Sequence, residues 1–427
     1  MRITILTTGS RGDTQPYIAL GVELKKHGHA VRLAAFQNYE SFVTEHGLDF
    51  YKIRGDVSLV AASVNSDKAM QADNPLKLLL SFNKLKGYVY DLQQDFFNAC
   101  KDSDIILYHP GAAVGYFAAQ YFKIPSVLAL PFPMSPTHEY PSLIFYDMPR
   151  FGKGFNYLSH KILEQIMWFA SSSPLKAFWK KEFGALPKGF ASPFSKQTTK
   201  ELPTIISCSE YVFPTPTDRP EHVHTTGYWF LDEEAGWSPS PELLDFLQKG
   251  SAPVYVGFGS IGNPNIAVQT TELVIEALKQ SCQRGVLATG WSGMSKLETL
   301  PENIFMLESV PHAWLFPRMA AVVHHGGAGT TAAGLRAGVP TIIIPSGTDQ
   351  FAWGRRVYEL GVGAKPIPRK KLTSENLSAA IQFALSQEIK DKAKVLGAKI
   401  RSENGTATAA KIIVDRVENS APRTTTS

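Results

Sequence analysis

The chain has 427 residues, of which 44% are hydrophobic and only 19% are charged, and it contains 25 Phe and 15 Tyr. This composition excludes a disordered or fibrous protein, and the length suits two globular domains of roughly 200 residues each. The net charge of +5 is small and unclustered, so nucleic acid is not an expected partner.

The cysteine pattern and the apolar runs predict a cytoplasmic location. Cys100, Cys208 and Cys282 lie far apart and lack C-x-x-C spacing, which favours neither a disulfide frame nor a zinc site. The first apolar run is soon broken by Gly, Arg and Asp, so we expect no secretion signal. The uncharged stretch 105–122 contains Pro and Gly, and we interpret it as buried rather than membrane-spanning.

Apolar runs alternate with helical patterns along the N-terminal half. The strands are expected at 2–8, 30–36, 104–109, 124–130 and 204–208, and the helices at 14–27 and 111–122. This alternation is typical of a parallel sheet with helices on both faces. The N-terminal half is therefore predicted to be a doubly wound α/β domain.

The same pattern restarts after a proline-rich stretch near residues 214–241. Further strands are expected at 253–259, 285–290, 303–309, 320–325 and 340–345. We therefore expect two Rossmann-like domains, with a polar connection between them. The expected ranges are 1–215 for the first domain, 216–240 for the linker, 241–400 for the second domain, 401–418 for a helix packing back toward the first, and 419–427 for a disordered tail.

Three glycine-rich turns follow expected strands, at 9–13, 257–262 and 324–331. Ligands of parallel α/β sheets bind at the carboxyl ends of strands, where such turns lead into helices. In the third turn, Gly327 and Gly329 leave backbone N–H groups open to an anion at a helix N-terminus. His325 and Thr330 add side-chain donors, so the turn can hold a diphosphate, although a buried histidine bonded to a carbonyl is the alternative.

Two other phosphate-binding motifs are absent from these turns. None of them has the Gly-Lys-Ser/Thr sequence of a nucleoside triphosphatase loop. The first turn also lacks the G-x-G-x-x-G spacing of NAD and FAD enzymes, and its second strand does not end in an acidic residue.

The motifs GSRGDTQPYIALGVELKKHGHAV, LPFPMSPTHEYP and VPHAWLFPRMAAVVHHGGAGTTAAGLRAGVPTIIIPSGTDQFAWGRRVYELGVG resemble those of the inverting nucleotide-sugar glycosyltransferases. Within this group the chain is most similar to sterol glucosyltransferases and related bacterial enzymes. The resemblance covers nearly the whole chain. It implies the GT-B fold, in which two Rossmann-like doubly wound α/β domains face each other across a cleft.

The resemblance also implies roles for single residues. Asp13 matches the catalytic base, with Ser10 and Gly12 in the same loop near the diphosphate. The donor side matches Ser260, His325, Gly327, Gly329 and Thr330 at the phosphates, Asp349 and Gln350 at the sugar, and Val310 and His312 at the base.

Some positions depart from the plant members of the family. Ser309 and Ala333 replace a stacking tryptophan and a ribose-binding glutamate, so UDP and dTDP both stay open. Trp291 can supply the stacking, or it is a core tryptophan. Asp13 takes the place of the catalytic histidine of the plant enzymes, as in the bacterial branch.

The expected reaction is inverting transfer of a hexose, glucose from UDP-glucose in the first instance, to a hydroxyl of a lipophilic acceptor. Asp13 would take the acceptor proton, or it would be only the N-cap of the following helix. No metal cluster with ligand spacing is visible, so we expect no cofactor and no metal requirement, with the UDP-sugar as co-substrate.

A helix is predicted over residues 155–183, and it is the candidate acceptor-binding region. It carries Phe155, Leu158 and Phe169 at helical spacing, with lysines around them and with Trp168 and Trp179 expected to be exposed. Such a helix usually packs on its own domain. The resemblance implies that this region lines the acceptor cleft, and its lysines and tryptophans also suit contact with an anionic membrane surface.

A nucleotide-sugar 2-epimerase and a non-catalytic nucleotide-sugar-binding protein of the same fold are the alternative functions. Aromatic enrichment over 132–194 argues against the epimerase, and retention of Asp13, His325, Asp349 and Gln350 argues against the binding protein. The acceptor, the sugar and the oligomeric state are left open by the sequence.

Overall fold

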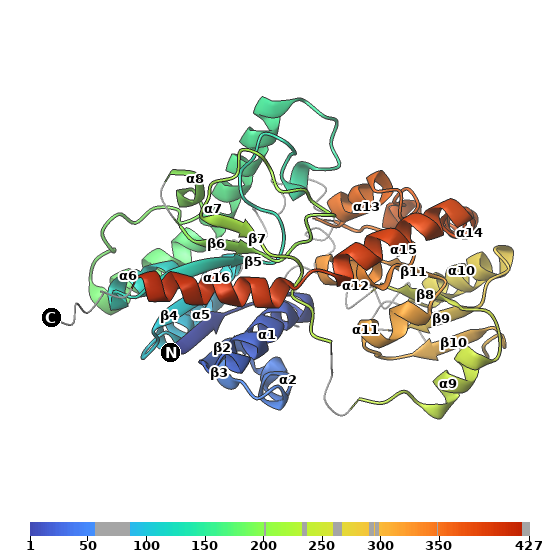
Figure 1. Cartoon of the computed structure of the whole chain (residues 1–427), viewed down its shortest axis with the longest axis horizontal. Helices are drawn as coiled ribbons and strands as arrows, with labels where there is room; N and C mark the ends of the chain where they lie inside the picture. The colour runs from blue at the N-terminus through green and yellow to red at the C-terminus, as the bar shows by residue number, and fades with distance from the viewer. Residues whose placement is uncertain are drawn as a thin grey trace. The chain divides into compact units, whose positions relative to one another are not determined.

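A computed structural model describes residues 1–55, 86–199, 202–232, 237–258, 267–289, 294, 299–347 and 349–420. The chain divides into two compact units (Figure 1). The first unit comprises Met1–Leu231 together with Glu403–Ser427, and the second comprises Asp232–Ser402.

The first unit contains a parallel sheet, in which the described strands follow the order β3-β2-β1-β4-β5-β6-β7. The strands are β1 (Arg2–Leu6), β2 (Ala30–Phe36), β3 (Asp49–Ile53), β4 (Ile105–Tyr108), β5 (Ser126–Leu130), β6 (Thr204–Ile206) and β7 (Val223–Thr225). The helices are α1 (Arg11–Lys26), α2 (Glu40–Glu45), α5 (Lys86–Ala99), α6 (Val114–Phe122), α7 (Lys153–Phe183), α8 (Lys196–Thr199) and α16 (Gly405–Ser420).

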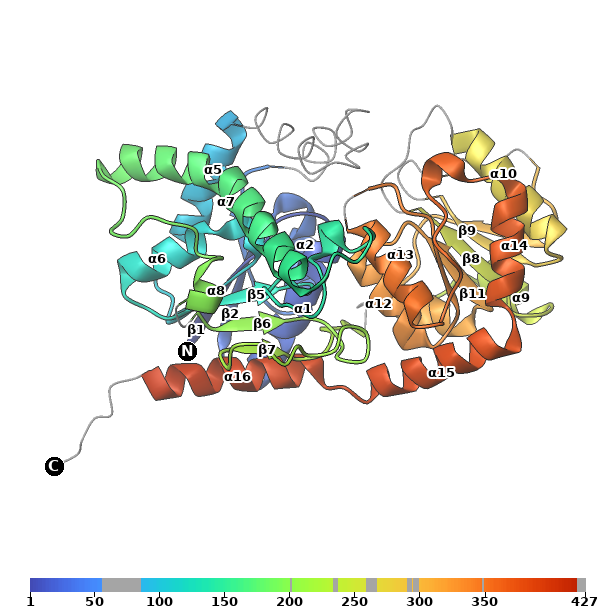
Figure 2. The ribbon, with the colours of Figure 1, turned by 90° about the horizontal axis from the view of Figure 1, so that it is seen from above.

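Helices cover both faces of this sheet, as a parallel sheet requires (Figure 2). On one face, Ile18 of α1 and Ile413 of α16 pack in a single core with Ile3, Ile5 and Leu107 of the strands. The other face carries α5, α6 and α7, and Phe96 of α5 and Phe117 of α6 are fully buried there. The predicted doubly wound topology is therefore confirmed for this unit.

The range expected as a linker, 216–240, has structure of its own. Strand β7 lies inside it and pairs with β6, so the first unit extends to Leu231. Helix α16 returns to pack against α1 of the first unit. Residues 421–427 of the expected tail lie outside the described residues.

The second unit repeats the architecture with described strands in the order β10-β9-β8-β11-β12, all parallel. The strands are β8 (Val254–Gly257), β9 (Gly285–Ala288), β10 (Ile304–Leu307), β11 (Ala321–His324) and β12 (Thr341–Ile343). The helices are α9 (Pro241–Gln248), α10 (Ala267–Gln280), α11 (His312–Leu315), α12 (Ala328–Ala337), α13 (Gln350–Glu359), α14 (Ser374–Ala384) and α15 (Gln387–Arg401). Each strand lies within the range expected from the sequence.

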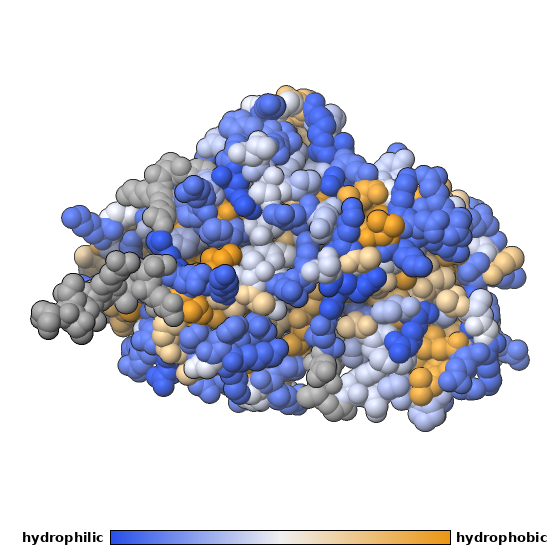
Figure 3. Space-filling model, in the orientation of Figure 1, coloured by the Kyte–Doolittle hydropathy of each residue, from blue (hydrophilic) through white to orange (hydrophobic). Residues whose placement is uncertain are grey.

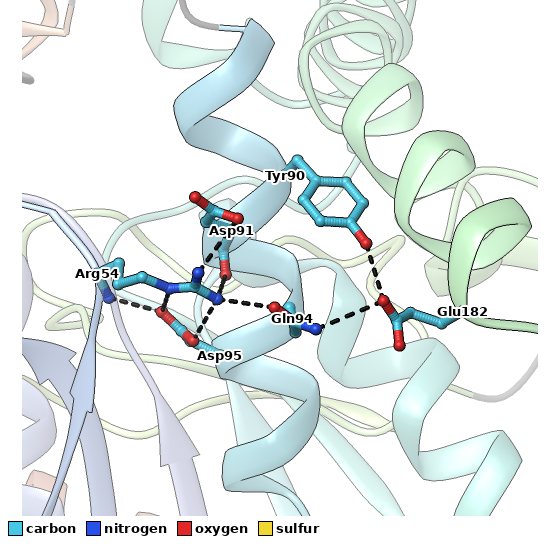
Figure 4. Close-up of polar contacts among 6 residues, drawn as sticks. All are labelled: Arg54, Tyr90, Asp91, Gln94, Asp95 and Glu182. Atoms are coloured by element: carbon cyan, nitrogen blue, oxygen red, sulfur yellow. Dashed lines mark hydrogen bonds and ion pairs between the residues drawn. The ribbon is translucent and has the colours of Figure 1, made fainter.

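A polar network joins the end of β3 to α5 and α7 (Figure 4). The Arg54 side chain donates to both carboxylate oxygens of Asp95 at 2.9 Å, and its backbone N–H donates to Asp95 at 2.7 Å. Its guanidinium also bonds Gln94 at 2.8 Å, and Gln94 and Tyr90 both donate to Glu182 of α7. The network fixes the edge strand to the helices that cover the sheet.

We predict that the Arg54–Asp95 pair contributes measurably to stability because Asp95 is largely buried and the contact is bidentate. In a double-mutant cycle with Arg54→Ala and Asp95→Ala, urea unfolding should give a coupling of about 1 kcal/mol. The Lys26–Glu23 pair in the same unit, which has a single contact and a lysine that is 68% exposed, is the control and should couple by a few tenths of a kcal/mol. Equal couplings for the two pairs would contradict the prediction.

Candidate functional site

The strand order of the first sheet reverses between β1 and β4, which lie side by side. The chain leaves β1 into α1 on one face, and it leaves β4 into the turn Pro110–Ala112 and α6 on the other. Ligands of open α/β sheets bind at such a point, because the helices that diverge from it leave a crevice. Asp13, in the first turn of α1, lies at this edge.

Asp13 is held by the residue that begins its helix. Its Oδ2 accepts hydrogen bonds from the backbone N–H of Ser10 at 2.7 Å and from Ser10 Oγ at 2.9 Å. Ser10 is the N-cap of α1 and Asp13 is its third helical residue, so the alternative that Asp13 itself is the N-cap is wrong. Both bonds end on Oδ2, and within the described residues Oδ1 has no hydrogen-bond partner.

The surroundings of Asp13 disfavour its charged form. Burial raises the pKa of Asp13 above its ordinary value, and the two hydrogen bonds from Ser10 oppose the rise. Thr7 Oγ1 donates to the Asp13 carbonyl oxygen at 3.0 Å and joins this turn of helix to the end of β1. Gly12 is exposed beside Ser10 in the same turn.

Gly9 leaves the space in which the Asp13 carboxylate lies. Its φ is +118°, a conformation that residues with a Cβ rarely adopt. A Cβ at this position would also collide with Oδ2 of Asp13 and lie 2.8 Å from its Cγ. The carboxylate thus lies in space that only glycine leaves open.

His109 is a residue that the sequence analysis did not select. It follows β4, and its Nδ1 accepts a hydrogen bond from the Gly111 backbone N–H at 2.9 Å. Its Nε2 is buried and has no partner within the described residues. Burial lowers the pKa of His109 to about 4, so the ring is neutral at pH 7. The sequence signal that could have identified it is the histidine directly after an apolar strand, followed two residues later by glycine.

The second unit has an equivalent turn after β11, the strand next to β8 at the reversal of its sheet. His324 Nδ1 accepts from the Gly326 backbone N–H at 3.0 Å, and its Nε2 is buried without a partner in the described part of the chain. Burial, with His325 and His312 adding to the effect, lowers the pKa of His324 well below its ordinary value. The rings of His324 and His325 lie with their centroids 6.2 Å apart.

The predicted diphosphate residues occupy the start of α12. Gly327 is the N-cap of this helix, and Gly329 and Thr330 lie in its first turn. His325 immediately precedes them, and burial lowers its pKa to about 4, so its ring is neutral. The Nδ1 of His325 is buried without a partner in the described residues, which leaves it available for a ligand.

Asp349 and Gln350 begin α13 on the same sheet edge. Gly326 packs directly against Gln350, at a φ of +92° that favours glycine. Asp349 Oδ2 accepts from Trp353 Nε1 at 2.9 Å, and Gln350 Oε1 accepts from the Ser346 N–H at 2.8 Å. The structure thus brings the predicted sugar-binding pair next to the predicted diphosphate turn.

The predicted base-binding residues lie beside the same helix. Val310 packs in one cluster with Ala333 of α12, and His312 stacks on Phe316 with ring centroids 4.3 Å apart. Ser260 and Trp291 lie outside the described residues.

Comparison with known proteins places the chain among the glycosyltransferases. Residues 3–139 match the family model "Glycosyltransferase family 28 N-terminal domain", and residues 274–419 match "Erythromycin biosynthesis protein CIII-like, C-terminal domain". A sterol 3-beta-glucosyltransferase of Arabidopsis thaliana is 36% identical over 423 residues, which cover 96% of this chain and 67% of the relative. The chain belongs to this glycosyltransferase family.

A second sequence relative and a solved structure are also similar to the chain over nearly its whole length. A sterol 3-beta-glucosyltransferase of Aspergillus oryzae is 37% identical over 433 residues, covering 98% of this chain but only 30% of that longer protein. Among solved structures, the glycotransferase of kitacinnamycin matches with a TM-score of 0.70 and 20% identity, covering 97% of this chain and 98% of the other. This likeness confirms the predicted GT-B fold class.

Helix α7 of the glycosyltransferase was expected to expose two tryptophans, and this was wrong for Trp179. Trp179 is only 3% exposed because the C-terminal half of α7 packs on α5 and α6, where its ring meets Phe97 and Phe117. Trp168 is partly buried. Leu158 and Phe169 are each 52% exposed, while the space-filling view shows apolar residues scattered in patches among hydrophilic ones (Figure 3).

Among the described residues, no group of three or more His, Cys, Asp or Glu side chains has an arrangement suited to a metal ion. No helix of the described part is both long and apolar enough to span a membrane. The three cysteines are free thiols.

We predict that Gly9→Ala in the glycosyltransferase displaces the Asp13 carboxylate, because the new methyl group would occupy its place. The matched control is Gly28→Ala, which has a φ of +82° but no atom within 4 Å of the added Cβ. Both variants should lose about 1–2 kcal/mol from backbone strain. Only Gly9→Ala should also lose Asp13-dependent turnover, measured at temperatures where both variants remain folded. Equal turnover in the two variants would contradict the steric role of Gly9.

Proposed function

We propose that this protein is an inverting, metal-independent glycosyltransferase that moves glucose from UDP-glucose to the hydroxyl of a sterol or a similar lipophilic acceptor. The observation that carries the proposal is the Asp13 carboxylate at the strand-order reversal, in a chain of a family that contains sterol 3-beta-glucosyltransferases.

Asp13 is suited to act as the general base. Oδ2 is occupied by Ser10, which leaves Oδ1 to accept the proton of an acceptor hydroxyl. Burial raises the pKa of the carboxyl, and a higher pKa makes it a stronger base. The deprotonated hydroxyl oxygen would attack the anomeric carbon from the face opposite the nucleotide, which inverts the configuration at that carbon.

The donor would bind to the second unit. The backbone N–H groups at the start of α12 and the nearby positive end of the helix dipole suit a diphosphate, whose negative charge grows as the sugar leaves. Neutral His325 would donate a ring N–H to a phosphate oxygen. Asp349 and Gln350 would bind sugar hydroxyls, and Val310 and His312 would contact the base. These donors support charge stabilisation without a metal ion.

The acceptor and the membrane are proposed partners of the first unit. Helix α7 exposes Leu158 and Phe169, with Lys153, Lys176 and Lys180 also exposed along it. Apolar side chains flanked by lysines suit a lipophilic ligand presented at an anionic lipid surface.

The test is mass spectrometry of reactions with UDP-glucose or dTDP-glucose and a panel of sterols, flavonoids, macrolides and diacylglycerol. A hexose adduct on a sterol is expected with UDP-glucose. Conversion of the nucleotide sugar without any acceptor would indicate an epimerase instead. Binding of UDP without either reaction would indicate a non-catalytic protein.

We predict that Asp13→Asn lowers turnover by about two to four orders of magnitude, since Asn can accept the Ser10 hydrogen bond but cannot take a proton. Thermal stability should not fall, because the raised pKa means that the carboxylate form is disfavoured in the folded state. In the wild type, kcat/KM should rise with pH through this raised pKa. Exposed Asp49→Asn is the control, and near-normal turnover of Asp13→Asn would exclude Asp13 as the base.

We also predict co-sedimentation with phosphatidylserine vesicles at low salt. Replacing Leu158 and Phe169 by serine should weaken binding at least about tenfold, because both apolar side chains would no longer enter the interface. Val395→Ser removes a similarly exposed apolar residue from α15 and should leave binding unchanged. Failure of the wild type to sediment would end the membrane proposal.

A further inference from the structure

His109 lies at the same reversal of strand order as the proposed catalytic base, Asp13. Its backbone N–H donates to the Leu6 carbonyl at 2.9 Å, which places it level with the end of β1. The next residue of β1, Thr7, holds the Asp13 backbone through its hydroxyl. Tyr17, one turn after Asp13 on α1, meets the His109 ring edge-on with centroids 5.9 Å apart. Asp13 and His109 therefore flank the same reversal of strand order.

The hydrogen bond from Gly111 determines the tautomer of His109. Because Nδ1 accepts the Gly111 N–H at 2.9 Å, that nitrogen carries no proton. The ring is neutral because burial lowers its pKa to about 4, so its one proton is on Nε2. His109 is thus a fixed N–H donor over the whole neutral range of pH.

This donor has no partner among the described residues. An unsatisfied buried donor costs free energy, so its presence in a fold calls for a group that binds there. The turn that creates it recurs at His324, on the corresponding strand of the second unit, where Nδ1 again accepts from the glycine two residues on. The same local geometry thus leaves one buried Nε2 donor at each reversal point.

We propose that His109 is a substrate-positioning donor, whose Nε2–H binds the acceptor hydroxyl oxygen while that hydroxyl donates its proton to Asp13. The inference rests on the proposed function and adds the group that orients the nucleophile. In the transfer step, the hydroxyl proton passes to Asp13 Oδ1 and the oxygen forms the new bond to the anomeric carbon. The bond from that carbon to the diphosphate oxygen breaks with its electron pair, and His109 keeps its proton throughout.

Two substitutions separate this role from a structural one. The amide oxygen of His109→Asn lies near the position of Nδ1 and can still accept from Gly111, but the variant lacks the distal donor. His109→Gln reaches the position of Nε2 with an N–H donor. We expect His109→Asn to lower kcat/KM for the acceptor about 10- to 100-fold, with the KM for the nucleotide sugar unchanged. His109→Gln should recover part of that loss.

Equilibrium binding of a sterol and of its analogue without the hydroxyl, measured without any donor, gives a test independent of turnover. The wild type should prefer the hydroxylated ligand, and His109→Asn should lose about tenfold of that preference while binding the analogue normally. An unchanged preference in an active, sterol-binding protein would show that Nε2 binds only water, and would overturn the inference alone. Absence of sterol transfer and sterol binding in the wild type would overturn the proposed function and the inference together.

Discussion

The reversal of strand order, at β1–β4 in one unit and at β8–β11 in the other, is the constraint on which both candidate sites depend. Parallel pairing places all strand ends of a sheet on one edge, and at the reversal the following helices depart to opposite faces. The strand ends there are not covered by a crossover, so their polar groups can meet a ligand. Asp13 and His109 occupy this position in the first unit, and the His324–Thr330 turn occupies it in the second.

Both candidate sites contain buried polar atoms that lack hydrogen-bond partners or whose charged form is disfavoured. The Nε2 atoms of His109 and His324 and the Nδ1 of His325 are buried without partners in the described residues, and the Asp13 carboxyl has a raised pKa. In a core, such groups would be replaced by apolar ones, because each costs about 1–3 kcal/mol when unsatisfied. Those at the two strand-order reversals lie where ligands of open α/β sheets bind, so they are the candidates for ligand contacts.

The sequence predicted the fold more fully than the site. Apolar runs of four to seven residues located the central strands, because burial on both faces of a parallel sheet demands them. Both edge strands were missed: β3 carries Asp, Tyr and Lys instead of an apolar run, and β7 has only three residues in a proline-rich stretch. Trp179 was misplaced because helical periodicity shows that a face is apolar, not which neighbour covers it. His109 was missed because its position at the strand-order reversal depends on β1. That strand lies about a hundred positions away in the sequence, and only strand pairing brings it next to β4.

The chemistry of Asp13 follows from two opposing effects on one carboxyl group. An ordinary aspartate, with a pKa near 3.9, is a weak base toward an alcohol, and burial alone would strengthen it while leaving its orientation free. The Ser10 hydrogen bonds lower the pKa again, but both act on Oδ2 and therefore fix the direction of Oδ1. Gly9 is required for this geometry, since any Cβ there would enter the space of the carboxylate. The short segment from Gly9 to Asp13 thus gives up some basicity for a fixed direction, and a fixed direction is what the in-line displacement we propose for Asp13 requires.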